Sequence, residues 1–335
     1  MKAAVIRLPA TLESLAIEER PDPTLAPGLV KVAWRALSLN FHDLVIVTGM
    51  LPTVDGRIPV SDGAGEIVEV GEGVAEYQIG DRVMSTFFPD WADGDPDAQN
   101  TARLAGDSTD GCGCEFSVVS PETLTRVPRG YSFAEAATLP CAALTAWRAL
   151  VDVAQLKSGQ TVLVQGSGGV SVFALQLAKA MGARVLATSS TPEKCERLRA
   201  LGADAVCNYR ETPDWGQWAA DQSGGGVDVL VDVGGPATLP QSLLAARVNA
   251  QIVCVGLLGG MDVSLSVPLM LLKQQQIRPI AVGNHVSQKA LVAFLDDTEL
   301  RPIIDRSFRL DQIVDALRYQ SSGKHFGKIV INLQE

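Results

Sequence analysis

The chain has 335 residues, 47% of them hydrophobic and 20% charged, so it can form two domains with sizeable cores. Its formal net charge of −10 argues against a nucleic-acid partner, because phosphate binding needs clustered Lys and Arg. No apolar run approaches the ~18 residues of a membrane span, and Met1–Ile6 predicts an opening strand rather than a signal peptide. The six scattered Cys favour reduced thiols, and we expect a cytoplasmic protein without a membrane partner.

The N-terminal third is rich in Val, Gly, Pro and Asp and carries short alternating runs between turn signals, at 29–36, 65–71 and 81–85. This pattern is typical of a β-rich, barrel-like domain, which we place at residues 1–125. The polar, acidic stretch 89–111 predicts a surface excursion. Cys112-Gly113-Cys114 is expected to be a turn leading into a strand rather than a metal site.

From about residue 160 the pattern changes to apolar strands that alternate with helical segments. The expected strands are 161–165, 184–188, 205–209, 228–233 and 251–255. This spacing predicts βαβ units and a doubly wound parallel sheet, in a second domain at residues 126–279. After about residue 280 the pattern reverts, and the closing strand 328–331 is expected to return to the first domain, so that 280–335 completes it. The fold class is therefore α/β.

A glycine-rich loop follows the first of these strands and precedes a helix. It reads Gly166-Ser167-Gly168-Gly169-Val170-Ser171. Glycines here allow a tight turn and a close approach of the backbone to a pyrophosphate at the helix N-terminus. Ser171 departs from the usual fingerprint but is still small. The loop predicts a dinucleotide site; the alternative is a tight turn without a ligand.

The end of the second strand bears on the choice of cofactor. An NAD site usually carries Asp or Glu at this place, and here it is Ser189, followed by Ser190. Lys194 lies five residues further on, and Tyr209 ends the third strand. Together they favour NADP(H), with NAD(H) possible. The alternatives are a solvated helix face for Lys194 and a packed strand end for Tyr209.

The arrangement resembles the medium-chain dehydrogenase/reductase superfamily, and within it the zinc-free quinone-oxidoreductase-like branch. Besides the glycine loop, the resemblance rests on residues 39–44, 62–68, 80–83, 136–140, 144–146 and 201–204. It implies a GroES-like catalytic domain, a Rossmann cofactor domain, and a homodimer or higher homo-oligomer.

The resemblance also locates the zinc ligands of the superfamily's alcohol dehydrogenases. The first ligand position is Asn40, the second is Ser61, and the third retains Cys141. An amide, a hydroxyl and one thiol do not make a tetrahedral zinc site. We therefore expect no metal.

Without zinc, the resemblance assigns the chemistry to polar side chains. Asn40 is implied at the nicotinamide and the substrate. His42 is either a proton shuttle or a packing or cofactor-ribose contact. Three aromatic residues either line the substrate pocket or pack under the excursion. They are Phe87, Phe88 and Trp91.

The family positions imply further cofactor contacts. In chain order these are Thr145, Val255, Gly256, Leu257, Val282, Gly283 and Phe326. The leading hypothesis is an NADPH-dependent enzyme that transfers hydride to a quinone or an α,β-unsaturated carbonyl, both of which are small molecules. The alternatives are a zinc-independent or atypical alcohol dehydrogenase or carbonyl reductase, and a nucleotide-binding protein without turnover.

Overall fold

The computed structural model describes residues 1–333, which form two compact units. The first unit comprises Met1–Leu144 and Gly283–Glu335, and the second comprises Thr145–Val282. The expected domain limits were 125/126 and 279/280, whereas the units divide at 144/145 and 282/283. The difference arises because α2 (Phe133–Ala137) packs on β3 and β4 of the first unit.

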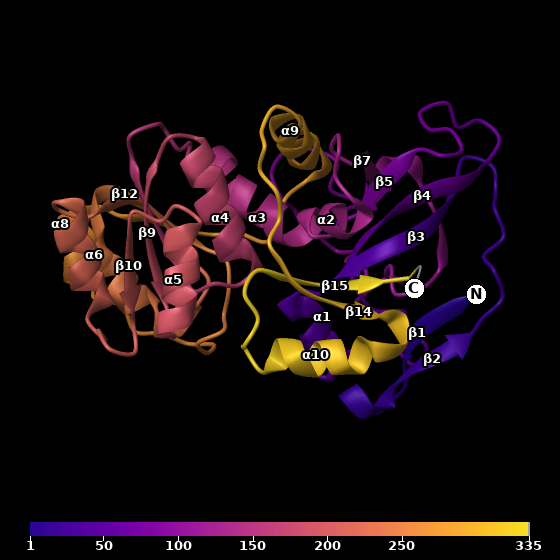
Figure 1. Ribbon diagram of the computed structural model, residues 1–335, viewed down its shortest axis with the longest axis horizontal. Helices are drawn as coiled ribbons and strands as arrows, with labels where there is room; N and C mark the ends of the chain where they lie inside the picture. Colours follow the sequence, from indigo (N-terminus) through magenta and orange to yellow (C-terminus); the bar gives the residue numbers. More distant parts are fainter. Residues whose placement is uncertain (334–335) are drawn as a thin grey trace. The chain divides into compact units, whose positions relative to one another are not determined.

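The first unit is built on a mixed sheet with the order β14-β15-β3-β4-β5-β7, in which β6 also pairs with β3. The N-terminal strands β1 and β2 form a separate antiparallel pair. Figure 1 shows β15 beside β3, although the two strands lie at opposite ends of the chain. The strands are β1 (Lys2–Ile6), β2 (Leu15–Glu19), β3 (Val30–Ser38), β4 (Asp62–Val70), β5 (Arg82–Ser85), β6 (Phe116–Val119), β7 (Leu124–Arg126), β14 (Ile304–Arg309) and β15 (Lys328–Asn332).

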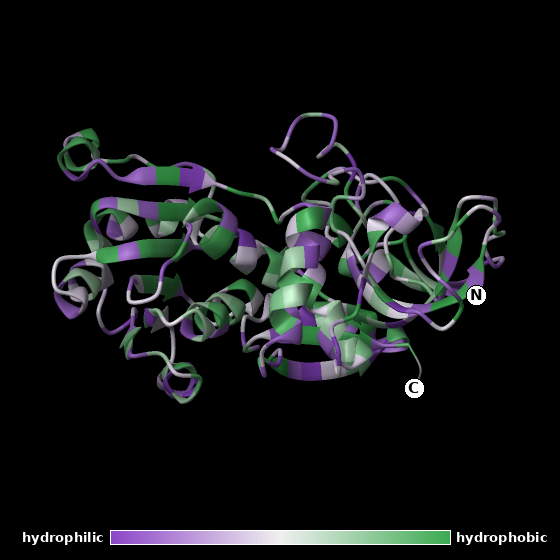
Figure 2. Cartoon of the chain, turned by 90° about the horizontal axis from the view of Figure 1, so that it is seen from above, coloured by the Kyte–Doolittle hydropathy of each residue, from purple (hydrophilic) through white to green (hydrophobic). Residues whose placement is uncertain are grey.

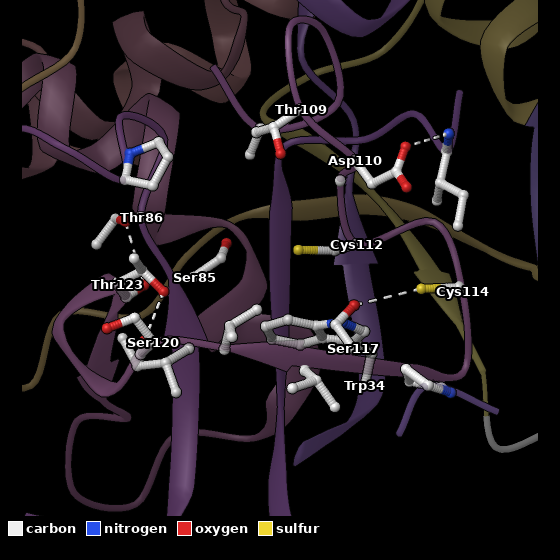
Figure 3. Close-up of a pocket in the computed structure, with 18 of the residues that line it drawn as sticks. Trp34, Ser85, Thr86, Thr109, Asp110, Cys112, Cys114, Ser117, Ser120 and Thr123 are labelled. Carbon is white, nitrogen blue, oxygen red and sulfur yellow. Dashed lines mark hydrogen bonds between the residues drawn. The ribbon is translucent and has the colours of Figure 1, made fainter. Parts of the chain in front are cut away.

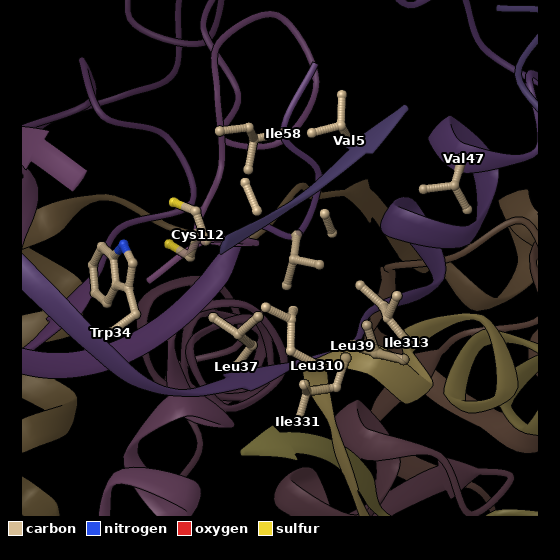
Figure 4. Close-up of a cluster of buried hydrophobic side chains, with 14 of the residues drawn as sticks. Val5, Trp34, Leu37, Leu39, Val47, Ile58, Cys112, Leu310, Ile313 and Ile331 are labelled. Atoms are coloured by element: carbon tan, nitrogen blue, oxygen red, sulfur yellow. The ribbon is translucent and has the colours of Figure 1, made fainter. Parts of the chain in front are cut away.

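Three further helices belong to this unit: α1 (Phe41–Val47), α9 (His285–Asp296) and α10 (Ile313–Ser321). The core is formed by apolar side chains from both ends of the sequence, several of which are drawn in Figure 4. Val5, Leu37 and Ile331 are each fully buried in it. Removal of this apolar surface from water is the main force that holds the C-terminal strand in the N-terminal sheet.

The second unit contains a parallel sheet with the strand order β10-β9-β8-β11-β12-β13. This is the doubly wound order in which the strand sequence reverses between β8 and β11, and ligands of such sheets bind beyond the carboxyl ends of the strands at that point. Figure 2 shows the strands of this sheet coloured mostly as hydrophobic residues, as expected for strands covered on both faces. The strands are β8 (Thr161–Gln165), β9 (Arg184–Ser189), β10 (Ala205–Asn208), β11 (Val227–Asp232), β12 (Ala246–Cys254) and β13 (Gln276–Pro279).

The helices that connect the strands of this unit are α4 (Gly169–Ala180), α5 (Pro192–Ala200), α6 (Trp215–Ser223), α7 (Leu239–Ala245) and α8 (Val267–Lys273), and α3 (Leu144–Trp147) precedes its first strand. The division between the units falls in a continuous helical segment, because π-helical turns flank α3 at Leu139–Ala143 and Arg148–Val153. Within residues 1–333, no helix has the length and apolar character needed to cross a membrane.

Candidate functional site

A buried lysine lies at the centre of the polar residues of the first unit. Lys328 begins β15, and the antiparallel pairing of β15 with β3 brings it beside the end of β3, where the Leu39 N–H donates to Ile329 O at 3.1 Å. Its side chain donates from Nζ to Leu39 O at 2.7 Å and to Asn40 Oδ1 at 2.5 Å. Lys328 is only 4% exposed and Asn40 only 8%. The ammonium is therefore bound to protein acceptors rather than to solvent.

Asn40 continues a hydrogen-bonded chain on the other side of its amide. Its Nδ2 donates to Ser61 Oγ at 3.1 Å, and Ser61 Oγ donates to Asp62 Oδ1 at 2.8 Å. Asp62 Oδ2 accepts the backbone N–H of Cys141 at 3.1 Å. The chain thus runs from a cation to a carboxylate through groups that are all buried or half-buried.

A second carboxylate, Asp43, holds the backbone on both sides of this chain. Its oxygens accept the N–H of Asn40 at 2.7 Å and that of Ser61 at 3.0 Å. Burial raises the pKa of Asp43 to about 6 and that of Asp62 to about 6, whereas the Lys328 ammonium lowers the pKa of both carboxyls. Lys328 is therefore the charge that favours the ionised form of both groups.

Asn40, Ser61 and Cys141 occupy the three positions at which the resemblance locates zinc ligands. Their side chains do not fit a zinc ion. The Asn40 oxygen binds an ammonium, whose positive charge would repel a second cation. The Ser61 hydroxyl is engaged with Asp62, which leaves Cys141 as the one thiol of the set. Within residues 1–333, no cluster of three or more His, Cys, Asp or Glu side chains could hold a metal ion.

His42 lies on the first turn of α1, two residues after Asn40. Its Nε2 is 3.5 Å from Asp107 Oδ2 and has no hydrogen-bond partner within residues 1–333. The ring stands edge-on to Phe87, with 5.5 Å between the ring centroids. Burial lowers the pKa of His42, and the negative charge of Asp107 opposes that shift. The imidazole is thus held neutral at neutral pH, beside a carboxylate on the surface excursion.

The aromatic residues expected at the substrate contact one another in series. Phe87 contacts Phe88, and Phe88 contacts Trp91, both in edge-on geometry. Trp91 is 1% exposed, and its indole N–H donates to Gly94 O at 3.1 Å. Of the three, Phe87 touches a candidate catalytic side chain. A role of the stack in substrate binding stays a prediction.

A cavity of about 590 Å³ lies elsewhere in the first unit. Figure 3 shows the thiol of Cys112 pointing into it and Cys114 turned toward Ser117. Burial raises the pKa of both thiols, so they are protonated and unreactive. None of the candidate catalytic residues lines this cavity.

The glycine loop of the second unit has the geometry of a phosphate cradle. Gly166 has a φ of +74°, which favours glycine, and its N–H donates to Thr188 O. Gly168 precedes α4, and a Cβ placed on it would meet no atom within 4 Å. The Ser171 hydroxyl donates to Gln165 O, which explains why a serine replaces the third small residue of the fingerprint. The open space at the α4 N-terminus fits a dinucleotide pyrophosphate.

The residues that favour NADP(H) follow the neighbouring strands at the same sheet edge. Ser189 ends β9 and is buried, and its carbonyl accepts the N–H of Tyr209 at 3.0 Å. Lys194 is half-buried in the first turn of α5, and Tyr209 is 39% exposed. The structure thus brings these three positions together beyond the carboxyl ends of β9 and β10.

The other expected cofactor contacts divide between the units. Val255, Gly256 and Leu257 follow β12, and Val282 follows β13, in a turn that Arg148 Nη1 fixes through the Ala281 carbonyl at 3.1 Å. The remaining set comprises Thr145 of the second unit, with Gly283 and Phe326 of the first. The side chain of Phe326 is 1% exposed, so a cofactor contact at that position would come from its backbone. The cofactor roles of all these residues stay predictions.

Sequence reasoning missed two residues of the site. Lys328 was expected only as the start of a strand, and the available signal was a charge at the head of an otherwise apolar run. Asp107 lies within the excursion, where many acidic residues have no role in the site, so nothing in the sequence distinguished it.

Comparisons with known proteins agree with this architecture. Residues 26–129 match the family model "Alcohol dehydrogenase GroES-like domain", and residues 169–297 match "Zinc-binding dehydrogenase". A zinc-type alcohol dehydrogenase-like protein of Schizosaccharomyces pombe is 40% identical over 318 residues, covering 92% of each chain.

Solved structures show the same likeness. A putative alcohol dehydrogenase from Sinorhizobium meliloti 1021 superposes with a TM-score of 0.94 at 38% identity, covering 99% of this chain and 98% of that one. A 2-octenoyl-CoA carboxylase reductase, solved in complex with NADP and 2-octenoyl-CoA, superposes with a TM-score of 0.89 at 25% identity. The match covers 99% of this chain and 87% of that one.

Proposed function

Since the chain belongs to the medium-chain dehydrogenase/reductase superfamily and is an NAD(P)-dependent oxidoreductase, we propose that it transfers hydride from NADPH to a quinone or an α,β-unsaturated carbonyl without a catalytic zinc. The observation that carries this proposal is the bond from Lys328 Nζ to Asn40 Oδ1. It places a cation and an amide where the superfamily's zinc enzymes hold a metal ligand.

The choice of hydride acceptor follows from the replacement of zinc by a cation and an amide. Zinc polarises a carbonyl and stabilises the developing alkoxide, so an isolated ketone loses its main electrophile when zinc is absent. A conjugated acceptor spreads the incoming charge onto a distant oxygen, where hydrogen-bond donors can stabilise it. The likeness to a reductase solved with NADP and 2-octenoyl-CoA, an unsaturated thioester, supports both the cofactor and the acceptor class.

The side chains of the first unit would then act as follows. Bound NADPH supplies the hydride. The Asn40 amide donates an N–H to the oxygen that gains negative charge. His42, neutral because burial lowers its pKa, relays a proton to the reduced product: one ring nitrogen accepts a proton from solvent beside Asp107 while the other gives up its own proton. The alternative for His42 is a contact with the cofactor ribose.

A second candidate is a zinc-independent alcohol dehydrogenase or carbonyl reductase, which the likeness to a putative alcohol dehydrogenase favours. A panel of acceptors with NADPH separates the candidates. Oxidation of NADPH by enones or quinones supports the leading proposal. Turnover restricted to simple aldehydes or ketones with NADPH, or to simple alcohols with NADP+, supports the second candidate. Tight NADPH binding with no turnover on the whole panel would contradict both.

The cofactor preference is tested by Lys194→Ala. We expect the Kd for NADPH to rise about 10- to 100-fold, because a charge-assisted contact with the 2′-phosphate is lost. The Kd for NADH should change less than about twofold, since NADH has no such phosphate. Fluorescence titration with both nucleotides measures the two constants.

Lys157→Ala is the matched control for that experiment. Lys157 is exposed and precedes β8, so it lies at the opposite, amino-terminal edge of the same sheet. It should leave both constants unchanged. Equal losses of NADPH and NADH affinity in Lys194→Ala would count against the preference for NADP(H).

A further inference from the structure

The side chain of Lys328 faces acceptors and acids from three segments of the first unit. Leu39 and Asn40 follow β3, Asp43 lies on α1, and Asp62 begins β4. The ammonium lowers the pKa of both carboxyls, so its charge is balanced by theirs. Burying an ammonium is costly unless it is paired and hydrogen-bonded, and Lys328 Nζ donates two hydrogen bonds beside these two carboxyls.

Two contacts fix the orientation of the Asn40 amide. An ammonium has donors only, so the group that faces Lys328 must be the amide oxygen. On the opposite side, the Ser61 hydroxyl donates to Asp62, so it must accept from the amide nitrogen. The amide dipole therefore points from the cation toward the carboxylate, and a flipped amide would lose both hydrogen bonds.

The fixed orientation leaves one kind of contact for a substrate. Asn40 Nδ2 carries two hydrogens, and it donates to Ser61 Oγ at 3.1 Å and also interacts with the Asp62 carboxylate. The nitrogen end of the amide therefore faces acceptors, while Lys328 holds the oxygen end. Asn40 is thus oriented as a donor, and a substrate oxygen on this side would meet its N–H.

We propose that Lys328 is a positioning residue that clamps Asn40 as a hydrogen-bond donor and supplies, through the amide, the positive charge that a metal supplies in zinc-dependent relatives. The inference rests on the proposed hydride transfer to a conjugated acceptor. It adds Lys328 as the residue that favours a substrate oxygen on which negative charge develops. A polarised N–H binds a negatively charged oxygen more strongly than it binds a neutral oxygen.

The test compares Lys328→Met with Lys328→Arg, using NADPH and the best enone or quinone of the panel. Lys328→Met should lower kcat about 10- to 100-fold, because the amide loses the partner that orients it. The KM for the acceptor and the Kd for NADPH should change less than about threefold, and Lys328→Arg should restore most of kcat because it keeps a buried cation and donors. Lys289→Met, which removes an exposed lysine of the same unit, is the matched control and should be unchanged.

A double-mutant cycle shows whether Lys328 acts through Asn40. In an Asn40→Ala background, Lys328→Met should cost less than about threefold in kcat, because the group that it positions is gone. If the kcat losses of Asn40→Ala and Lys328→Met multiply in the double variant, the inference is overturned. The inference also fails if Lys328→Met keeps the kcat of the natural protein. It fails as well if Lys328→Arg has a kcat as low as that of Lys328→Met.

Folding and the proposed function are controlled separately. Thermal unfolding and NADPH titration identify a variant that has lost its fold. In that case Lys328→Gln replaces Lys328→Met, and its kcat is expected to lie below that of Lys328→Arg, because its amide keeps a donor for Asn40 but carries no charge. If the natural protein oxidises NADPH with an enone and every Lys328 variant does so equally, the positioning role fails and the proposed function stands. If the natural protein turns over no conjugated acceptor, the proposed function fails and the inference falls with it.

Discussion

Asn40→Asp is expected to lower kcat about 10²- to 10³-fold, the loss that follows removal of one donor to a developing oxyanion. The substitution is isosteric and keeps an oxygen for Lys328 Nζ, so the bond that anchors the side chain survives. It replaces the N–H with a carboxylate oxygen, which would repel the negative charge gained by the acceptor. Steady-state kinetics with NADPH and an enone measure the effect.

The control is the stability of the same variant. The new carboxylate still accepts from Lys328, but it loses the bond to Ser61 and joins the buried Asp43 and Asp62, so the melting temperature of the variant should fall. Its NADPH affinity should stay close to that of the natural protein, and thermal unfolding shows that it is folded at the assay temperature. Asn40→Ala leaves the buried ammonium short of an acceptor and should also be less stable than the natural protein, by about 1–3 kcal/mol. A natural kcat in Asn40→Asp would show that Asn40 donates nothing to the reaction.

Gly168→Val should abolish tight dinucleotide binding, with an increase in Kd of at least about 100-fold. The backbone of Gly168 has a φ of −76° and a ψ of −179°, which valine adopts readily, and a Cβ there meets no protein atom within 4 Å. The side chain would therefore leave the fold intact and fill the space that we assign to the pyrophosphate at the α4 N-terminus.

Nucleotide fluorescence titration and thermal unfolding separate these two effects. Gly168→Ala places a smaller group in the same space and should give an intermediate Kd. An unfolded Gly168→Val protein would contradict the open geometry of the loop. A folded variant that binds NADPH normally would show that the pyrophosphate lies elsewhere.

The dinucleotide-binding half of the chain could be predicted from its sequence because its signals are local. Thr161–Gln165 is the strand that the apolar run predicted, and α5 carries the local capping residues Thr191 and Pro192 at its start. The helix after the glycine loop begins at Gly169, inside the loop motif. Its first turn is built from the loop glycine itself, which apolar periodicity does not register.

The electrostatic centre of the catalytic half could not be predicted, because it depends on contacts between distant segments. Lys328 and Asn40 are 288 residues apart in the sequence, and they meet only because β15 pairs with β3. The motif around Asn40 predicted a polar group near the chemistry. That motif could not indicate the cation that orients the amide, nor that Asp43 and Asp62 would be buried around it.

The most direct test of the central claim is the zinc content of the purified protein, measured together with its activity after treatment with a chelator. The account predicts well under one zinc per chain and unchanged oxidation of NADPH by an enone or quinone after chelation. Stoichiometric zinc, with activity lost on its removal and restored by its return, would contradict the assignment of Lys328 and Asn40 to the place of the metal.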